Sequence, residues 1–514
     1  MTTPKFLQNV AVLGHGVTGR AVSSVLRELG ASVTIYTTTP NTDGKPENDQ
    51  TQPTQTGEES RHGETVINGQ IEYVLAHLQE NQYQVIITSP GISPSNPLYQ
   101  AGATYAEDHG IGPLWSEMEL AWHLAEHLGK DIDWYTVTGT NGKTTTVSLV
   151  GAMLTAAGIP NAVVGNVGRS IVEVIAHQDV KALAVEMSSF QLHNTYSVQP
   201  VASVCLNVDA DHLDWHGTSE AYAADKARVY SNTEIACVYD ALDAQIIKMV
   251  AEADVIEGAR AIGYRADIPA RGEIGIVENY LVDRAYGEKY WEEATAVATL
   301  EDVQTFAGKT PSPAVLSDVL AAIALVRAKE LSPEAIRAGL QNFRPAPHRR
   351  EIVGEAADMT WIDDSKATNA HAAMASLRGF PSGSVIWIAG GDTKGQDFSE
   401  LVQKVQSQLR GVVVIGADPT PMVKALEAHA ATVPYVVVDG HEDFMYSVVN
   451  EAVALSRPGD HVVLAPACAS WDQFNSYAER GEVFKEAVAR LKEAWAQAGT
   501  LESKDTGEPQ TKES

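Results

Sequence analysis

Short hydrophobic runs alternate with amphipathic segments of helical length along most of this chain. The runs end in turns rich in Gly, Ser and Asp, and apolar residues then recur at helical spacing, as Val147, Val150 and Leu154 do. Strands that alternate with helices in this way predict parallel sheets with crossover helices. The pattern therefore predicts the α/β fold class.

The 514 residues exceed what one hydrophobic core usually supports, so we expect several domains. The pattern predicts an N-terminal Rossmann-like domain over 1–131, a central domain with a phosphate loop over 132–343 and a C-terminal Rossmann-like domain over 344–500. Residues 37–65 contain no aliphatic or aromatic side chain, so we expect a flexible insertion there, and likewise a disordered polar tail over 501–514. Residues 266–310 are less regular, and we expect a β-rich excursion whose role the sequence does not indicate.

The composition of the chain argues against several classes of function. The net charge of -29 disfavours nonspecific binding to nucleic acid or to an anionic membrane. No apolar run approaches the roughly 20 residues that span a bilayer, and the start of the chain lacks a signal pattern, so we expect a cytoplasmic protein without membrane insertion. Three widely spaced cysteines argue against a disulfide framework or a thiolate zinc site, and we expect them to be buried.

A glycine-rich turn joins the strand-like run at 135–138 to the next helix. It reads Gly139-Thr140-Asn141-Gly142-Lys143-Thr144-Thr145. Backbone N–H groups at such a helix N-terminus, with Lys143, favour a phosphate chain, and Thr144 offers a hydroxyl for Mg²⁺. Val137 stands where the usual loop has its first Gly, so an ordinary turn is the alternative. The flanking strand and helix favour an ATP site.

A second glycine pattern lies near the N-terminus. The strand at 9–13 runs into Gly14-His15-Gly16-Val17-Thr18-Gly19 and then a helix, which is typical of a Rossmann-like diphosphate site. A site for a nicotinamide dinucleotide usually has an acidic residue at the end of the next strand, and the strand-like run at 33–37 ends without one. A diphosphate ligand other than NAD therefore fits better. The run at 85–88 leads into Ser89-Pro90-Gly91, either a ligand contact or a simple turn.

Polar clusters follow two strands of the central domain. Glu186 ends the run at 182–186 and could hold a cation near the phosphate loop; an ordinary acid before a helix N-cap is the alternative. The next run leads to an acidic loop in which His212 could complete a second Mg²⁺ site. A solvated acidic loop is the alternative there.

Further clusters mark the C-terminal domain. Arg349 lies where the second and third domains join and could grip phosphate from a moving domain, although a surface linker charge is the alternative. Strand ends in the third domain carry polar loops at 363–369, 390–394 and 465–474. Because parallel strands end at one edge of a sheet, these loops can converge on one carboxylate-bearing substrate.

The motifs resemble those of the Mur ligase family. The resemblance rests on Thr138-Gly139-Thr140-Asn141-Gly142-Lys143-Thr144-Thr145, on Asp364-Ser365-Lys366-Ala367-Thr368-Asn369 and on Pro466-Ala467-Cys468-Ala469-Ser470-Trp471-Asp472-Gln473-Phe474, and it spans about 8–495 without the polar insertion. Members that add diaminopimelate or lysine carry an Asp-Asn-Pro motif that is absent here. The resemblance implies an ATP-dependent, amide-bond-forming ligase that adds D-glutamate to UDP-N-acetylmuramoyl-L-alanine through an acyl phosphate. It places the protein in peptidoglycan synthesis, hence in cell-wall biogenesis, cell shape and cell division.

The resemblance also implies roles for matched residues, with ATP and two Mg²⁺ ions as cofactors. ATP would contact Gly139, Asn141, Gly142, Lys143, Thr144, Thr145, Arg349 and Asp364. The metal ligands would be Thr144, Glu186, His212 and a carbamylated Lys226. The UDP-sugar substrate would contact Gly14, Gly16, Thr18, Gly19, Ser89, Gly91 and Asn166. D-Glutamate would meet Lys366, Thr368, Lys394, Ser470 and Tyr477, the last in place of a more familiar Phe. The catalytic set would be Lys143, His212, Lys226 and Lys366.

One segment departs from the family pattern, and three rival functions stay open. The family's Gly-x-His-Asn appears here as Ser312-Pro313-Ala314-Val315, so the means of adenine binding is not predicted. The rivals are a folylpolyglutamate synthase, a nucleotide-binding regulator and a dehydrogenase. The N-terminal glycine unit disfavours the first, which needs no uridine-diphosphate domain. Protein partners, oligomeric state and order of substrate addition are not predicted.

Overall fold

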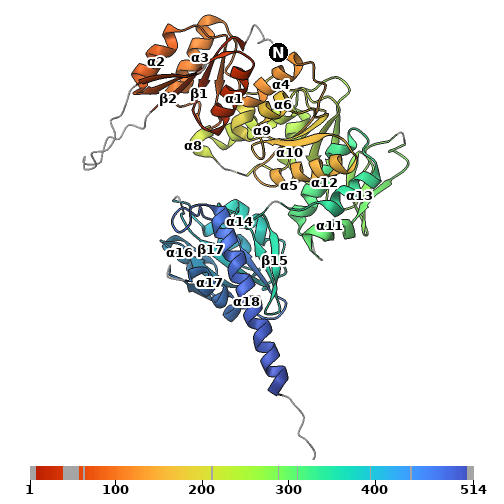
Figure 1. Ribbon diagram of the computed structural model, residues 1–514. Coiled ribbons are helices and arrows are strands. Elements are labelled where there is room, and N and C mark those ends of the chain that lie inside the picture. The colour runs from red at the N-terminus through yellow and green to blue at the C-terminus, as the bar shows by residue number, and fades with distance from the viewer. Residues whose placement is uncertain are drawn as a thin grey trace, which may run out of the picture. The chain divides into compact units, whose positions relative to one another are not determined.

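The chain folds into two compact units, and each is described by itself. The structure, a computed structural model, describes residues 7–38, 57–61, 64–209, 212–287, 289–308, 311–345, 347–393, 395–439 and 443–505. The first unit comprises Met1–Thr305 and Val315–Phe343, and the second comprises Phe306–Ala314 and Arg344–Ser514. The predicted α/β fold class is confirmed, because helices pack on largely parallel sheets in both units (Figure 1). In the described ranges, no helix is long and apolar enough to cross a membrane.

The N-terminal sheet of the first unit has the strand order β3-β4-β2-β1-β5. All pairs are parallel except β3 with β4. Local sequence sets the helix ends: the side chain of Asn96 accepts from Leu98 N at 2.9 Å at the start of α3, and Gly110 ends that helix with φ +62°. The elements are β1 (Asn9–Leu13), α1 (Val17–Glu28), β2 (Ser32–Thr38), β3 (Gly57–Arg61), β4 (Glu64–Gly69), α2 (Ile71–Glu80), β5 (Val85–Thr88), α3 (Pro97–His109) and α4 (Glu117–His127).

The prediction of a flexible insertion over 37–65 was wrong at both of its ends. β2 continues to Thr38, β4 begins at Glu64, and β3 pairs with β4 in an antiparallel register. An edge strand is held by backbone hydrogen bonds, so β3 can form without apolar residues. Residues 39–56, 62 and 63 lie outside the described part of the chain.

The central sheet has the order β14-β13-β12-β11-β10-β9-β6-β8-β7. Its strands are parallel from β7 to β12, and an antiparallel meander of β12, β13 and β14 lies within the predicted β-rich excursion. The elements are β6 (Asp133–Thr138), α5 (Lys143–Ala156), β7 (Asn161–Gly165), α6 (Ile171–His177), β8 (Ala182–Glu186), α7 (Ser189–His193), β9 (Ala202–Cys205), α8 (Leu213–His216), α9 (Ser219–Ala227), the 3₁₀ turn η2 (Arg228–Tyr230), β10 (Ala236–Asp240), α10 (Ala244–Ala251), β11 (Arg260–Tyr264), β12 (Glu273–Val277), β13 (Tyr280–Asp283), β14 (Thr295–Thr299), α11 (Leu300–Ala307), α12 (Pro313–Arg327) and α13 (Pro333–Asn342).

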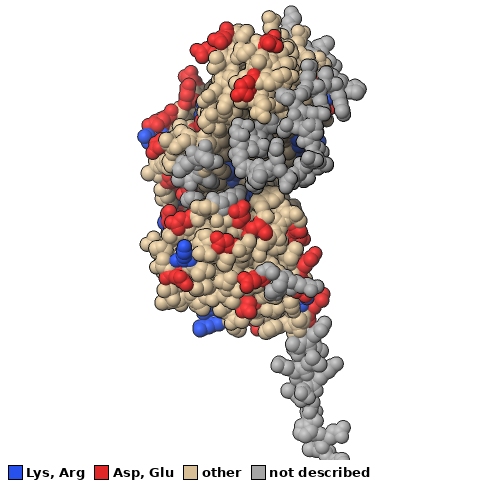
Figure 2. Space-filling view, turned by 90° about the vertical axis from the view of Figure 1, so that its left-hand side faces the viewer, with Lys and Arg blue, Asp and Glu red and all other residues tan. Residues whose placement is uncertain are grey.

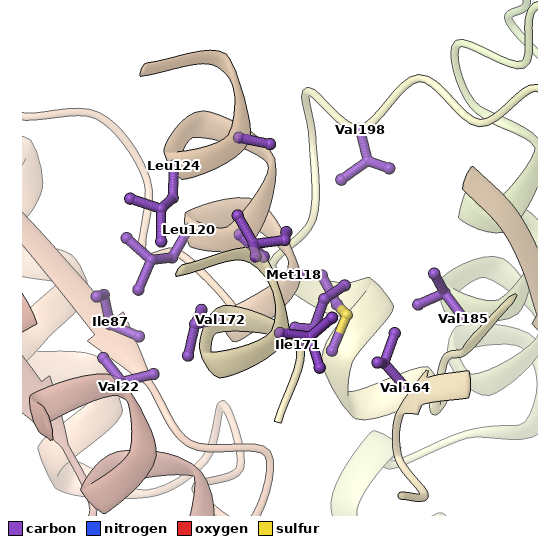
Figure 3. Close-up of a cluster of buried hydrophobic side chains, with 14 of the residues drawn as sticks. Val22, Ile87, Met118, Leu120, Leu124, Val164, Ile171, Val172, Val185 and Val198 are labelled. Carbon is purple, nitrogen blue, oxygen red and sulfur yellow. The ribbon is translucent and has the colours of Figure 1, made fainter. Parts of the chain in front are cut away.

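One hydrophobic core joins the N-terminal and central sheets. Val22 and Ile87 of the N-terminal domain share one buried cluster with Met118, Leu120 and Leu124 on α4 and with side chains of α6, β7 and β8 (Figure 3). All of these side chains are fully or almost fully buried. Apolar burial therefore holds the first two predicted domains together as one unit.

The second unit contains a sheet of order β15-β16-β20-β17-β18-β19, parallel except for β15 with β16. Phe306–Ala314, predicted to belong to the central domain, belongs to this unit. The predicted tail was wrong in part, because the last helix continues to Asp505: residues 501–505 prolong a helix that is already formed, so they need no new nucleus. The elements are β15 (Glu351–Ala356), β16 (Met359–Asp363), α14 (Ala370–Leu377), β17 (Val385–Gly390), α15 (Ser399–Val405), β18 (Leu409–Ile415), α16 (Thr420–His429), β19 (Tyr435–Val437), α17 (Phe444–Leu455), β20 (His461–Leu464) and α18 (Tyr477–Asp505).

On the surface that Figure 2 shows, acidic side chains are more frequent than basic ones. Asp and Glu are spread over this face, while Lys and Arg are few, in keeping with the net charge of -29.

The three cysteines are free thiols and buried, as predicted.

Candidate functional site

The glycine-rich turn after β6 folds around its own lysine. The Lys143 ammonium donates to the carbonyl oxygens of Gly139 at 2.7 Å and Thr140 at 2.9 Å. The turn is tied to the segment that follows β9, because Asn141 N donates to Asn207 Oδ1 at 2.9 Å. Since α5 begins at Lys143, its first backbone N–H groups and the positive end of its dipole lie at the turn. This arrangement can bind an anion such as a phosphate chain.

Glu186 lies beside this turn at the end of β8. Thr144 Oγ1 donates to Glu186 Oε2 at 2.7 Å, and Asn166 Nδ2 donates to Glu186 Oε1 at 2.9 Å. Thr144 and Glu186 are both buried. A hydroxyl and a carboxylate are oxygen ligands of the kind that Mg²⁺ prefers, so these two residues fit the ion. The structure thus places Glu186 next to the phosphate loop, and its metal role stays a prediction.

Lys226 reaches the same turn from α9. It is only 2% exposed, and its Nζ donates to Gly139 O at 2.8 Å. The ammonium also lies 4.7 Å from the centroid of the Tyr222 ring, a distance at which a cation is attracted to an aromatic face. Two lysines therefore donate to one carbonyl oxygen, which concentrates positive charge beside the turn.

The segment that carries His212 leads into the short helix α8. His212 is exposed, has φ +52°, and its ring contacts the Phe190 ring edge-on at 4.9 Å between centroids. His216 follows four residues later, with Nδ1 3.0 Å from Asp225 Oδ2 and Nε2 3.0 Å from Ser189 Oγ. Both ring nitrogens of His216 therefore have partners, and the metal role of His212 stays a prediction.

The two predicted turns of the N-terminal domain lie together. A Cβ on Gly19 would lie 2.1 Å from Gly14 O, so only glycine permits this approach. Ser89 Oγ donates to the same Gly14 oxygen at 3.3 Å. Trp215 Nε1 donates to Pro90 O at 3.2 Å, which links the second turn to α8 of the central domain. The other predicted contacts for the UDP-sugar lie on these two segments: Gly16, Thr18 and Gly91.

In the second unit, the three predicted loops meet at the carboxyl edge of the sheet. Asp392 and Ala469 exchange two backbone hydrogen bonds, of 2.9 and 3.0 Å, which join the loops after β17 and β20. Ala467 N donates to Ala367 O at 2.9 Å, which joins the loops after β20 and β16. Of the predicted D-glutamate residues on these loops, Lys366, Thr368 and the buried Ser470 are described, and Lys394 lies outside the described residues.

The buried guanidinium of Arg480 ties two of these loops to α18. It donates to Ser365 Oγ and O, both at 2.9 Å, and to Cys468 O at 3.2 Å. These acceptors are neutral, and burial lowers the pKa of Arg480 to about 10. Beside it, the Lys366 ammonium lies 3.9 Å from the centroid of the Tyr477 ring. Tyrosine in place of the expected Phe thus keeps an aromatic face for Lys366.

Arg349 and Asp364 lie close together in the second unit. Arg350 N donates to Asp364 Oδ1 at 3.3 Å, and Arg349 precedes it in the chain. Burial raises the pKa of Asp364, while the positive charges of Arg350 and Arg349 oppose that rise. Behind them, His348 Nδ1 and Asp363 Oδ2 form a buried pair at 2.7 Å.

Comparison with known proteins adds to this geometry. Family models match two segments: a Mur ligase middle domain over 137–275, and a Mur ligase, glutamate ligase domain over 348–468. A UDP-N-acetylmuramoylalanine–D-glutamate ligase of Streptomyces avermitilis is 43% identical over 486 residues, covering 94% of this chain and 98% of the relative. The chain belongs to the Mur ligase family. A ligase of the same name from Mycobacterium avium is 39% identical to this Mur ligase over 508 residues, covering 93% and 96%.

A solved structure supports the fold of this Mur ligase. The crystal structure of MurF ligase from Thermotoga maritima in complex with ADP aligns with a TM-score of 0.52 at 14% identity, covering 96% of this chain and 99% of that one. At that identity the likeness shows the fold alone. The family assignment depends on the closer relatives and on the two family models.

Tyr222 and Asp318 of this Mur ligase are among the residues at the phosphate loop that sequence reasoning missed. The hydroxyl of Tyr222 lies 3.1 Å from Thr140 Oγ1. Its position four residues before Lys226, on the same helix face, was the signal that could have found it. Asp318 on α12 packs so closely that a Cβ on Gly142 would lie 2.2 Å from its Oδ1. Asp318 comes from a distant segment, so no local spacing pointed to it.

Proposed function

We propose that this Mur ligase uses ATP to join D-glutamate to UDP-N-acetylmuramoyl-L-alanine in peptidoglycan synthesis. Its curated relatives, which cover nearly the whole chain, carry the name of this reaction. The observation that carries the proposal is the glycine turn at the start of α5, where Lys143 lies inside the turn and Thr144 is bonded to Glu186. We assign the reaction to the cytoplasm, where ATP is available.

The proposed chemistry has two steps. First, the L-alanyl carboxylate attacks the γ-phosphorus of ATP, which gives an acyl phosphate and ADP. The amine of D-glutamate then attacks the acyl carbon, so that phosphate leaves, a proton is lost and the amide bond forms. Phosphoryl transfer depends mainly on positioning and on neutralising charge. Lys143 supplies a fixed positive charge for that purpose.

Four residues would hold two magnesium ions. Thr144 and Glu186 would hold one, and His212 and Lys226 would serve the second. When bound, the ions neutralise charge on the phosphate oxygens. Lys226 would act as its carbamate, because the added carboxylate would offer oxygen ligands to the second ion.

The remaining contacts are proposed from the resemblance and from the places of the loops. The turns at Gly14–Gly19 and Ser89–Gly91 would hold the uridine diphosphate, and Asn166 the muramoyl part. Arg349 and Asp364 would contact the nucleotide. The D-glutamate contacts would be Lys366, Thr368, Lys394, Ser470 and Tyr477.

Phosphate release tests the proposal. We expect phosphate release with UDP-N-acetylmuramoyl-L-alanine and D-glutamate. We expect none when L-lysine replaces D-glutamate, and none when glutamylated pteroate replaces the nucleotide sugar. Activity on the pteroate would favour a folylpolyglutamate synthase. Phosphate release that does not depend on any added amino acid would favour a nucleotide-binding regulator. In a parallel test, we expect ATP to protect the parent protein from heat more strongly than it protects the Lys143→Ala variant. Equal protection of both would refute the role of Lys143.

A further inference from the structure

A chain of hydrogen bonds runs through three short helices beside the phosphate loop. Ser189 Oγ on α7 lies 3.0 Å from His216 Nε2 on α8, and His216 Nδ1 lies 3.0 Å from Asp225 Oδ2 on α9. The other carboxylate oxygen of Asp225 lies 2.9 Å from His193 Nδ1. Ser189 is 2% exposed, Asp225 is 8% exposed and the His216 side chain is fully buried.

Hydrogen-bonding chemistry fixes the direction of this chain. A carboxylate only accepts, so His216 Nδ1 must carry the proton that it shares with Asp225. Burial lowers the pKa of His216, which favours the neutral ring. The Nε2 of a neutral ring then accepts the hydroxyl proton of Ser189.

The same order of groups occurs in nucleophilic triads, but burial rules out that role here. A nucleophilic serine must reach the carbonyl or phosphorus that it attacks. With 2% of its surface exposed, Ser189 cannot meet a substrate. The chain of hydrogen bonds must therefore act through the groups that it connects.

Each member of the chain lies next to a proposed magnesium ligand. Ser189 follows Glu186 by three residues, His216 follows His212 by four, and Asp225 directly precedes Lys226. The Phe190 ring adds a second link, since it stacks on His216 at 5.5 Å and contacts His212 at 4.9 Å. The bond from His216 to Asp225 joins α8, which His212 directly precedes, to α9, which carries Lys226.

We infer that Ser189, His216 and Asp225 are positioning residues for the magnesium site of His212 and Lys226. This inference rests on the proposed function. Groups that support metal ligands without touching the ion typically change metal affinity by about 10- to 100-fold when removed. We expect losses of that size when this chain is broken.

The test compares two serines in the central domain. Ser189→Ala removes the first hydroxyl of the chain. Ser203→Ala is the matched control, because Ser203 is also buried and its hydroxyl bonds Thr233 Oγ1 at 2.7 Å, away from the ligand helices. His216→Phe is a stronger variant, which keeps a ring against Phe190 but loses both hydrogen bonds.

The readouts are the dissociation constant for Mn²⁺, from the electron paramagnetic resonance signal of the free ion, and the Mg²⁺ concentration that gives half-maximal rate. We expect both to rise about 10-fold or more in Ser189→Ala and His216→Phe but not in Ser203→Ala, with the KM for D-glutamate unchanged. Equal metal binding in Ser189→Ala and Ser203→Ala would overturn the inference. If His216→Phe does not fold, Ser189→Ala alone decides.

The two proposals fail in different ways. If the parent protein forms no product from D-glutamate, the proposed function is wrong, while Mn²⁺ binding by the same variants still tests the positioning role. If the parent forms product and the Ser189→Ala variant binds Mn²⁺ as tightly as the parent, the positioning role is wrong and the function stands.

Discussion

The phosphate loop of this Mur ligase contains a glycine whose replacement should cost stability for two separable reasons. Gly142 caps α5 with φ +86°, a region that L side chains rarely adopt. An added Cβ would also lie 2.2 Å from Asp318 Oδ1 and 3.0 Å from Leu206 Cδ1. The natural control lies just past the other end of the same helix. Gly158 has φ +73°, and nothing lies within 4 Å of its added Cβ.

The geometry gives different magnitudes for the two variants. An alanine in the left-handed region costs roughly 1–2 kcal/mol, and this applies to both Gly142→Ala and Gly158→Ala. Overlap in a packed site typically adds about 1–3 kcal/mol, and this applies to Gly142→Ala alone. We therefore expect a loss of about 2–5 kcal/mol for Gly142→Ala and about 1–2 kcal/mol for Gly158→Ala.

Urea unfolding of the two variants and the parent measures these losses, and ATP protection from heat reports on the loop itself. Gly142→Ala should lose most of its ATP protection, and Gly158→Ala should keep it. A double-mutant cycle with Asp318→Ala isolates the overlap, because removing the Asp318 carboxylate should recover part of the Gly142→Ala loss. The reasoning is refuted if Gly142→Ala is no less stable than Gly158→Ala, or if the cycle shows no coupling.

Three further predictions concern a lysine at the phosphate loop, a leucine of the common core and two buried cysteines. Lys226→Ala should lose ligase activity, and short-chain carboxylates should partly restore it. A carbamate would be contradicted if no carboxylate restored activity and if the activity of the parent enzyme did not depend on carbon dioxide. Leu120→Ala, in the core that joins the first two sheets, should cost about 2–5 kcal/mol and lower the urea midpoint of the first unit; an unchanged midpoint would show that this core does not join them. Burial raises the pKa of Cys205 and Cys468 to about 12. Because the thiolate is the reactive form, both thiols should resist iodoacetamide at pH 8 in the native protein and react with it in urea. Rapid native alkylation would contradict their burial.

Local sequence patterns predicted the elements whose signal lies within one segment. The strand, glycine turn and helix around Lys143 form as expected, because β-branched residues, Gly and helical spacing occur in sequence there. The run at 461–464 forms β20 over the same residues. The convergence of the C-terminal loops was also predictable, since parallel strands share an edge.

Features that depend on distant pairs were not predictable from one sequence. The pairing of β3 depends on backbone hydrogen bonds to β4, which leave no apolar pattern. The approach of Asp318 to Gly142 joins segments far apart in the chain. The common core around α4 depends on Leu120 and its neighbours, whose spacing marks a buried helix but not the two sheets that it joins.

The two lysines at the phosphate loop give a physical reason to expect the carbamate. Lys143 and Lys226 both donate to Gly139 O, at 2.7 and 2.8 Å, so two ammonium groups share one oxygen. Because both bond the same oxygen, their Nζ atoms are no farther apart than the sum of 2.7 and 2.8 Å, and like charges at such a separation repel by roughly 3 kcal/mol or more at an effective dielectric constant of about 20. Carbamylation of Lys226 would replace that repulsion with attraction, so Lys143 should stabilise the carbamate. Carbon-13 NMR with labelled bicarbonate should therefore show a carbamate signal in the parent protein that weakens in Lys143→Ala and is absent in Lys226→Ala. An equal signal in the parent and in Lys143→Ala would refute this coupling.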